Sequence, residues 1–128
     1  MFVIRKEQIQ HFIAADENEL TFEVAKSVRR SVGERVSSYS DTDLRRMVGI
    51  GIARARANKL TAAEDIAAFV AVMLEVAPRF DEQKDIRQIL DNELLAPEVR
   101  FYQIFDLAQD QAWAEAERRY DDDFWFPG

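Results

Sequence analysis

The chain has 128 residues, of which 48% are hydrophobic, and this is enough for one domain with a substantial core. It contains no cysteine, which excludes disulfides and a thiol nucleophile and is compatible with a reducing cytosol. Its net charge of −7 disfavours general nucleic-acid binding, because such binding depends on neutralising phosphates. Charges at Arg5, Lys6 and Glu7 interrupt the stretch that a signal peptide needs to be apolar, so we expect a cytoplasmic protein.

The charges are unevenly distributed along the chain. Residues 1–60 contain 11 Lys or Arg against 8 Asp or Glu, a net charge of +3, whereas residues 61–128 contain 6 against 16, a net charge of −10. An acidic second half suits a partner with a basic surface, although solubility alone is the more common reason for such charge. The most apolar segment has a charge-free run from Ile66 to Leu74, only 9 residues long. A membrane span needs about 20, so no membrane association is expected.

The first part of the chain predicts one long helix, or two shorter ones, within residues 5–32. The chain has only 4 glycines and 3 prolines, which favours helices throughout. The polar segment 15–19 would be the place of a break, but it contains neither Gly nor Pro, and one helix ending at Gly33 is favoured. The inward-facing stripe consists of Ile9, Phe12, Ile13, Leu20, Val24 and Val28.

A second helix is predicted from Ser40 or Asp41, either of which can cap it, to about Asn58. Its apolar face consists of Leu44, Met47, Val48, Gly51, Ile52 and Ala55. Gly49 and Gly51 superficially resemble the start of a dinucleotide-binding fingerprint, but the third glycine and the preceding strand are missing. The small residues Gly49, Gly51, Ala53 and Ala55 are instead expected to let this helix approach the central helix, on the side formed by Ala67, Ala68 and Ala71.

Four arginines, Arg45, Arg46, Arg54 and Arg56, surround the second helix. A phosphate-binding patch is one interpretation. Intramolecular ion pairing is favoured over it, because the arginines spread over several sides of the helix and the second half of the chain is acidic.

A buried central helix is predicted over about residues 62–78. Thr61 and Glu64 have the spacing of a capping box at its start, and Pro78 lies near its C-terminal end. The stripe consists of Ile66, Phe69, Val70, Met73, Leu74 and Ala77. Alanines and valines occupy much of the opposite side, so this helix is apolar nearly all round, which is typical of a core helix.

Two more helices are predicted after Phe80. The first is short and amphipathic, with Ile86, Ile89, Leu90 and Leu94 on its apolar side. The second begins at Pro97, a favourable first helical residue, and continues to near Tyr120. Its stripe consists of Val99, Tyr102, Ile104, Phe105, Ala108, Ala112 and Ala116. The expected fold is therefore all-α: a single domain over residues 1–128, built as a bundle of four to five helices around the central helix.

Candidates for catalysis or metal binding are few. His11 is the only histidine, and Glu7 and Asp16 do not stand at a metal-ligand spacing from it. The serines have no other histidine that could act as a general base. The acidic run 121–123 lacks the interspersed carbonyl ligands and the glycine of a calcium loop, so a solvated charge run is expected. We expect a protein that is not an enzyme, with no catalytic, cofactor-binding or metal-binding residues and no cofactor.

The acidic-aromatic tail, residues 121–128, is the main lead toward function. It contains Asp121, Asp122, Asp123, Phe124, Trp125 and Phe126. Exposed aromatic side chains at this density are costly, so the tail either folds back onto the bundle or inserts into a partner. The sequence leaves both open, with fold-back somewhat favoured. These six residues are the candidate partner-binding residues.

Several stretches resemble a group of small, uncharacterised, all-helical bacterial proteins encoded near type VI secretion spike and polymorphic toxin genes. The resemblance starts in MFVIRKEQIQHF and continues in GIARAR (51–56), LTAAEDI (60–66), FVAVM (69–73), PRFD (78–81) and Ile89-Leu90. The region over which these stretches are distributed, residues 1–90, is roughly two-thirds of the 128-residue chain. It implies an accessory, adaptor or immunity role and carries over no catalytic residue. The polar segment 16–19 and the tail 121–126 depart from it.

From these observations we expect a non-enzymatic protein-binding accessory, of the immunity or adaptor/chaperone type, that engages a type VI secretion effector or toxin partner. The acidic second half would steer the encounter and the aromatic tail would anchor it. The alternative is a self-associating structural helical domain, a homodimer without a toxin partner.

Overall fold

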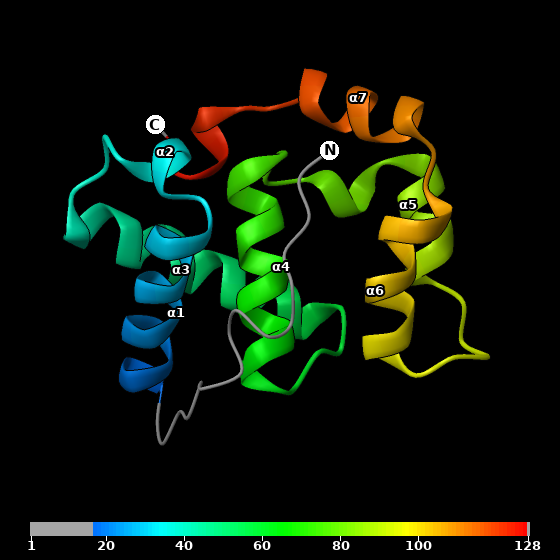
Figure 1. Ribbon diagram of the computed structural model, residues 1–128, viewed down its shortest axis with the longest axis horizontal. Helices are drawn as coiled ribbons and strands as arrows, with labels where there is room; N and C mark the ends of the chain where they lie inside the picture. The colour runs from blue at the N-terminus through cyan, green and yellow to red at the C-terminus, as the bar shows by residue number, and fades with distance from the viewer. Residues whose placement is uncertain (1–16, 128) are drawn as a thin grey trace.

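The computed structural model describes residues 17–127, which form seven α-helices, two short 3-10 helices and no strand (Figure 1). The helices are α1 (Glu17–Ser31), α2 (Gly33–Val36), α3 (Asp41–Ala57), α4 (Ala63–Glu75), η2 (Phe80–Glu82), α5 (Lys84–Leu90), α6 (Pro97–Leu107), α7 (Asp110–Arg118) and η3 (Asp122–Phe124). The expected all-α single domain is confirmed. The expected count of four to five helices is too low, because α2 is a separate short helix and the last predicted helix is divided into α6 and α7.

The first helix buries the residues that its periodicity predicts. Leu20, Val24 and Val28 are all buried in α1. The chain does not stop at Gly33 in a left-handed turn, because α1 ends at Ser31 and Gly33 begins the four-residue helix α2. The predicted stripe residues Ile9, Phe12 and Ile13, and the question of one helix or two, lie outside the described residues.

Helix α3 has a cap at each end. At its start the Ser40 hydroxyl oxygen accepts a hydrogen bond from the amide of Asp43 at 3.1 Å, as predicted for an N-cap. At its end Lys59 has a φ of 68°. The Leu60 amide donates to the carbonyl of Ala55 at 3.2 Å and the Lys59 amide donates to that of Arg56 at 2.9 Å, the pair of bonds that defines a Schellman turn.

The close approach of α3 and α4 depends on Gly51. A Cβ atom at Gly51 would lie 2.8 Å from Cγ2 of Val70, whereas a Cβ at Gly49 would meet nothing within 4 Å. Small-residue packing of the two helices is thus confirmed for Gly51. The three atoms nearest to the added Cβ belong to Val70, which is not one of the three alanines named in the prediction. Of the other small residues Ala55 is buried, whereas the prediction was wrong about Gly49 and Ala53, which are exposed.

Helix α4 is buried without interruption from Asp65 to Leu74. It is shorter than the predicted 62–78. The predicted capping box does not form: the N-cap is Ala62, which offers no side-chain acceptor, and Thr61 is exposed. The first turn is held instead by a tertiary contact, in which the Tyr102 hydroxyl donates to Oδ1 of Asp65 at 2.9 Å. Burial, together with this hydrogen bond, raises the pKa of Tyr102 well above its ordinary value.

The last helices surround a cluster of aromatic rings. Trp113 of α7 stacks on Phe105 of α6, with ring centroids 5.7 Å apart, and on Phe80 at 6.3 Å. Phe69 of α4 contacts Phe80 and Phe101 at 4.9 and 5.6 Å. These rings join α4, η2, α6 and α7 into one core.

Two residues that were predicted to belong to apolar stripes in this region are exposed. Pro97 begins α6 as predicted, but Val99 is exposed, and Leu94 lies outside α5 with 93% of its surface exposed. No described helix combines the length and the apolar character that crossing a membrane requires.

Candidate protein-binding site

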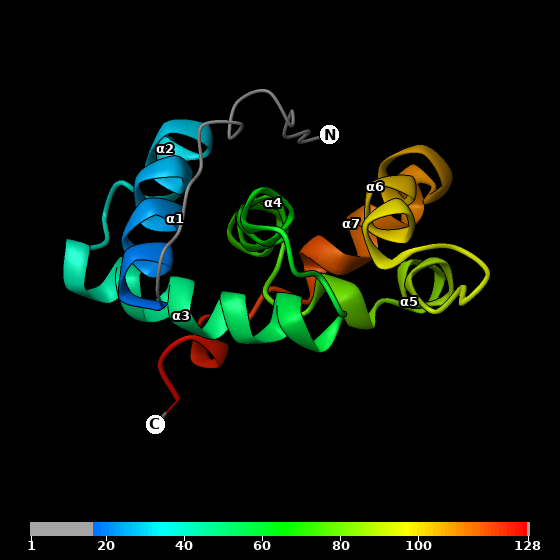
Figure 2. The ribbon, with the colours of Figure 1, turned by 90° about the horizontal axis from the view of Figure 1, so that it is seen from below.

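The tail folds back onto the helices. After α7 the chain crosses back toward α3, and the tail lies on the side of α3 that faces away from α1, as the two ribbon views show (Figures 1 and 2). A short turn, η3, organises it: Oδ1 of Asp121 accepts from the amide of Asp123 at 2.9 Å, and the Phe124 amide donates to the carbonyl of Asp121 at 3.1 Å. All three aspartates are exposed.

Trp125 anchors the tail. Its side chain is 0% exposed and belongs to the hydrophobic core, and its indole N–H donates to the hydroxyl oxygen of Tyr120 at 3.2 Å. Burial is the main cause that raises the pKa of Tyr120 to about 12. Fully burying a large aromatic side chain stabilises a fold by about 3 kcal/mol. Of the two outcomes that the sequence left open, the structure has fold-back.

The other two aromatic rings of the tail lie against cationic side chains. The ring of Phe124 lies 5.3 Å from the guanidinium carbon of Arg54 and 5.4 Å from that of Arg79. The ring of Phe126 lies 5.5 Å from the guanidinium carbon of Arg46. Each such cation–π contact contributes about 0.5–1 kcal/mol at a partly exposed site.

Phe126 also contacts the ring of Tyr39, with centroids 6.3 Å apart. We refer to the side chains of Tyr39, Arg46, Arg54 and Arg79 as the tail surface. They come from the segment before α3, from α3 itself and from the segment after α4. Sequence reasoning did not assign Tyr39 or Arg79 to this surface. The signal available was indirect: an aromatic tail needs a cover, and exposed arginines provide flat cationic faces for it.

Arg54 is held in place by a polar network beneath the tail. Its Nε donates to the two carboxylate oxygens of Asp81 at 2.9 and 3.1 Å, and it also pairs with Glu82. The Nδ2 of Asn58 donates to Asp81 at 3.0 Å, and the Nη2 of Arg87 donates to Oδ1 of Asn58 at 2.9 Å. Asp81 is 3% exposed, so its charge is compensated by these donors rather than by water.

The predicted intramolecular pairing of the α3 arginines is therefore confirmed for Arg54. The guanidinium of Arg46 lies on the ring of Phe126 instead. Arg45 and Arg56 are exposed, and Arg56 also interacts with another group of the chain. A phosphate-binding patch of all four arginines would need the guanidinium of Arg54, which is already paired with Asp81 and Glu82.

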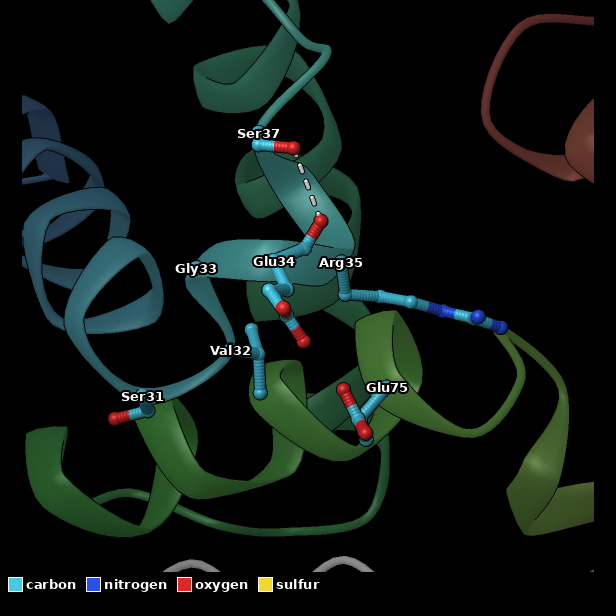
Figure 3. A pocket seen from close by; sticks show the side chains of 7 residues that line it. All are labelled: Ser31, Val32, Gly33, Glu34, Arg35, Ser37 and Glu75. Carbon is cyan, nitrogen blue, oxygen red and sulfur yellow. Dashed lines mark hydrogen bonds between the residues drawn. The ribbon is translucent and has the colours of Figure 1, made fainter.

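A shallow depression of about 770 Å³ lies at the junction of α1, α2 and the end of α4 (Figure 3). Its polar lining includes Glu34 and Glu75, and the Ser37 hydroxyl donates to the carbonyl of Glu34 at 3.0 Å. Among the described residues, its lining contains carboxylates, hydroxyls and the guanidinium of Arg35, with neither an imidazole nor a thiol. In the part of the chain that the structure describes, no group of histidine, cysteine or acidic side chains is placed to hold a metal ion. His11 lies outside that part.

Comparisons with protein-family models, with curated proteins and with solved structures find no match to this chain.

Proposed function

We propose that this chain is a non-enzymatic protein-binding accessory of the immunity or adaptor/chaperone type, which engages a type VI secretion effector or toxin partner in the cytoplasm. The proposal rests on the family resemblance of its sequence and on the chemistry of the tail. In this proposal α4 is the centre of a rigid helical body, supported by its unbroken burial from Asp65 to Leu74, and recognition occurs at the periphery.

The observation that supports it most directly is the way in which the tail is presented. Trp125 is buried and fixes the segment, while the carboxylates of residues 121–123 stay exposed beside the half-buried rings of Phe124 and Phe126. A partner can reach the carboxylates and the outer edges of these two rings without unfolding the body. In this arrangement Trp125 acts as a positioning residue and not as a contact.

This acidic-aromatic edge suits a partner with a basic surface. Opposite charges steer the encounter and raise the association rate, and the effect falls as salt screens it. Aromatic rings at the centre of the contact supply the short-range part of the affinity. If the carboxylates steer the encounter and the rings hold the complex together, neutralising the carboxylates should slow association more than it speeds dissociation.

The test is co-expression of this chain with each toxin or secretion component encoded beside it, followed by co-purification and growth measurement. Rescue of growth supports the immunity form, and co-purification without rescue supports the adaptor form. If no neighbouring product binds, the proposal is refuted.

A matched pair of variants then tests the site. Asp122→Asn with Asp123→Asn removes two exposed charges and spares Asp121, whose carboxylate holds the turn. The control, Glu93→Gln with Glu98→Gln, removes two exposed charges near α6. We expect the first pair to reduce the association rate and its salt dependence, and the control to leave both nearly unchanged. Equal effects would show that net charge matters and the tail does not.

A further inference from the structure

The tail is a self-contained structural unit. Besides the hydrogen bond of Phe124 described above, the Trp125 amide donates to the carbonyl of Asp122 at 3.1 Å and the Phe126 amide donates to the same carbonyl at 3.4 Å. The turn therefore satisfies these amides within the segment. A segment that carries its own backbone hydrogen bonds can leave one surface and settle on an equivalent one without breaking a helix or a sheet.

The contacts that hold the tail on the body are made by side chains. Phe124 and Phe126 lie on Arg46, Arg54 and Arg79, and Trp125 enters the core. Arg54 is already oriented by Asp81, independently of the tail. The tail surface is thus organised by its own body and binds the segment as it would bind a short peptide with the same side chains.

The connection between the body and the tail is short. Arg119 is the C-cap of α7 and Asp121 is the N-cap of η3, so Tyr120 alone separates the two elements. Short hinges favour exchange of the element that follows them between copies, because opening the hinge relieves its constraint and every contact is remade on the second molecule.

We propose that residues 121–127 exchange between two copies of this chain, so that the tail of each protomer occupies the tail surface of the other. The tail surface determines which side chains can bind to it. Its guanidinium groups offer cationic faces to two aromatic rings, and the core offers a buried position to an indole. In the structure, residues 121–127 occupy this surface. A second copy of the chain carries the same segment. This interaction is separate from the proposed binding of a toxin or effector.

The exchange has a defined concentration dependence. The contacts are the same within one chain and between two, so the dimer competes with an effective concentration of the attached tail that is on the order of mM for a short link. We expect monomers at micromolar concentration, and dimers when the chain is unfolded and refolded together near mM concentration. The dimer should persist after dilution, because dissociation requires Trp125 to leave the core.

The experiment refolds the full chain at both concentrations, at an ionic strength of about 0.15 M so that the repulsion between two chains is screened. Molar mass is then measured by light scattering after size exclusion. A matched pair of variants assigns the interface. One carries Gly-Gly-Ser inserted after Tyr120, which lengthens the hinge and favours closure within one chain, and the control carries the same insertion after Asn92, in the exposed loop before α6.

Tail exchange predicts a dimer peak for the natural chain and for the Asn92 insertion, and loss of that peak for the Tyr120 insertion with helix content unchanged by circular dichroism. A single monomer peak for the natural chain at both concentrations overturns the proposal. A dimer that survives the Tyr120 insertion also overturns it, because another face must then hold the two copies together.

Discussion

Replacing Gly51 with alanine tests the contact between α3 and α4. The new Cβ would lie 2.8 Å from Cγ2 and 3.1 Å from Cγ1 of Val70, so a buried side chain or the helix itself must shift. Overpacking of this kind costs about 1–3 kcal/mol. The same change gains about 1 kcal/mol, because alanine favours a helix more than glycine does. The net expectation for Gly51→Ala is a loss of roughly 0–2 kcal/mol in the free energy of unfolding.

The control lies two residues away in the same helix. A Cβ at Gly49 meets nothing within 4 Å, so Gly49→Ala keeps the gain in helix propensity and has no overpacking cost. The two variants should therefore differ by about 1–3 kcal/mol in urea unfolding followed by circular dichroism. Adding Val70→Ala should cost less in the Gly51→Ala background than in the natural chain. If Gly51→Ala proves as stable as Gly49→Ala, the close approach of α3 and α4 is refuted.

Lys59→Gly should stabilise the fold by about 1 kcal/mol in urea unfolding, because Lys59 has a φ of 68°; no gain would contradict the Schellman turn. Asp81→Asn should cost about 2 kcal/mol, since it removes a buried charged acceptor, whereas the exposed Asp91→Asn should cost under about 1; equal losses would contradict the network. Folding raises the pKa of Tyr120 to about 12, which means that the neutral hydroxyl stabilises the folded state. This contribution to the free energy of unfolding is complete below about pH 10 and is lost as pH rises toward 12. In the Tyr120→Phe variant, Tm should therefore fall less steeply between about pH 10 and 12. An unchanged slope would refute the role assigned to the Tyr120 hydroxyl.

Local signals in the sequence were sufficient where a helix end depends on neighbouring residues. Ser40 caps α3 and Pro97 begins α6, because an N-cap hydroxyl and a proline at the first position act within one turn. The predicted capping box at the start of α4 does not form, and the first turn is held instead by Tyr102, a residue 37 positions away from Asp65. Spacing within a capping box contains no information about such a partner.

The division between α6 and α7 has a geometric reason that periodicity could not reveal. In one continuous helix Phe105 and Trp113 would be separated by eight residues, about 12 Å along the axis. Their ring centroids lie 5.7 Å apart, with the rings nearly parallel, so the chain must turn between them. It does so at Ala108, where ψ is 130°, without a glycine or a proline to mark the place.

The sequence indicated that the tail needs burial, but it did not indicate the surface on which the tail packs. Three aromatic residues at one end of the chain indicate a need for burial, and this is satisfied within the molecule. The surface that satisfies it is assembled from Tyr39, three separated arginines and the core position of Trp125. No local pattern connects these positions, because only the tertiary fold brings them together.

The position of the tail also has a consequence for the order in which the molecule folds. The network around Asp81 closes loops of 23 to 29 residues, whereas Phe126 contacts Tyr39 and Arg46, which lie 87 and 80 residues before it in the chain. Shorter loops close sooner, so the α3–α4–η2 unit is expected to form while the tail is still free. During synthesis the tail surface stays uncovered until residues 121–127 leave the ribosome. Pulse-labelled hydrogen exchange should therefore find the amides around Trp125 among the last to gain protection.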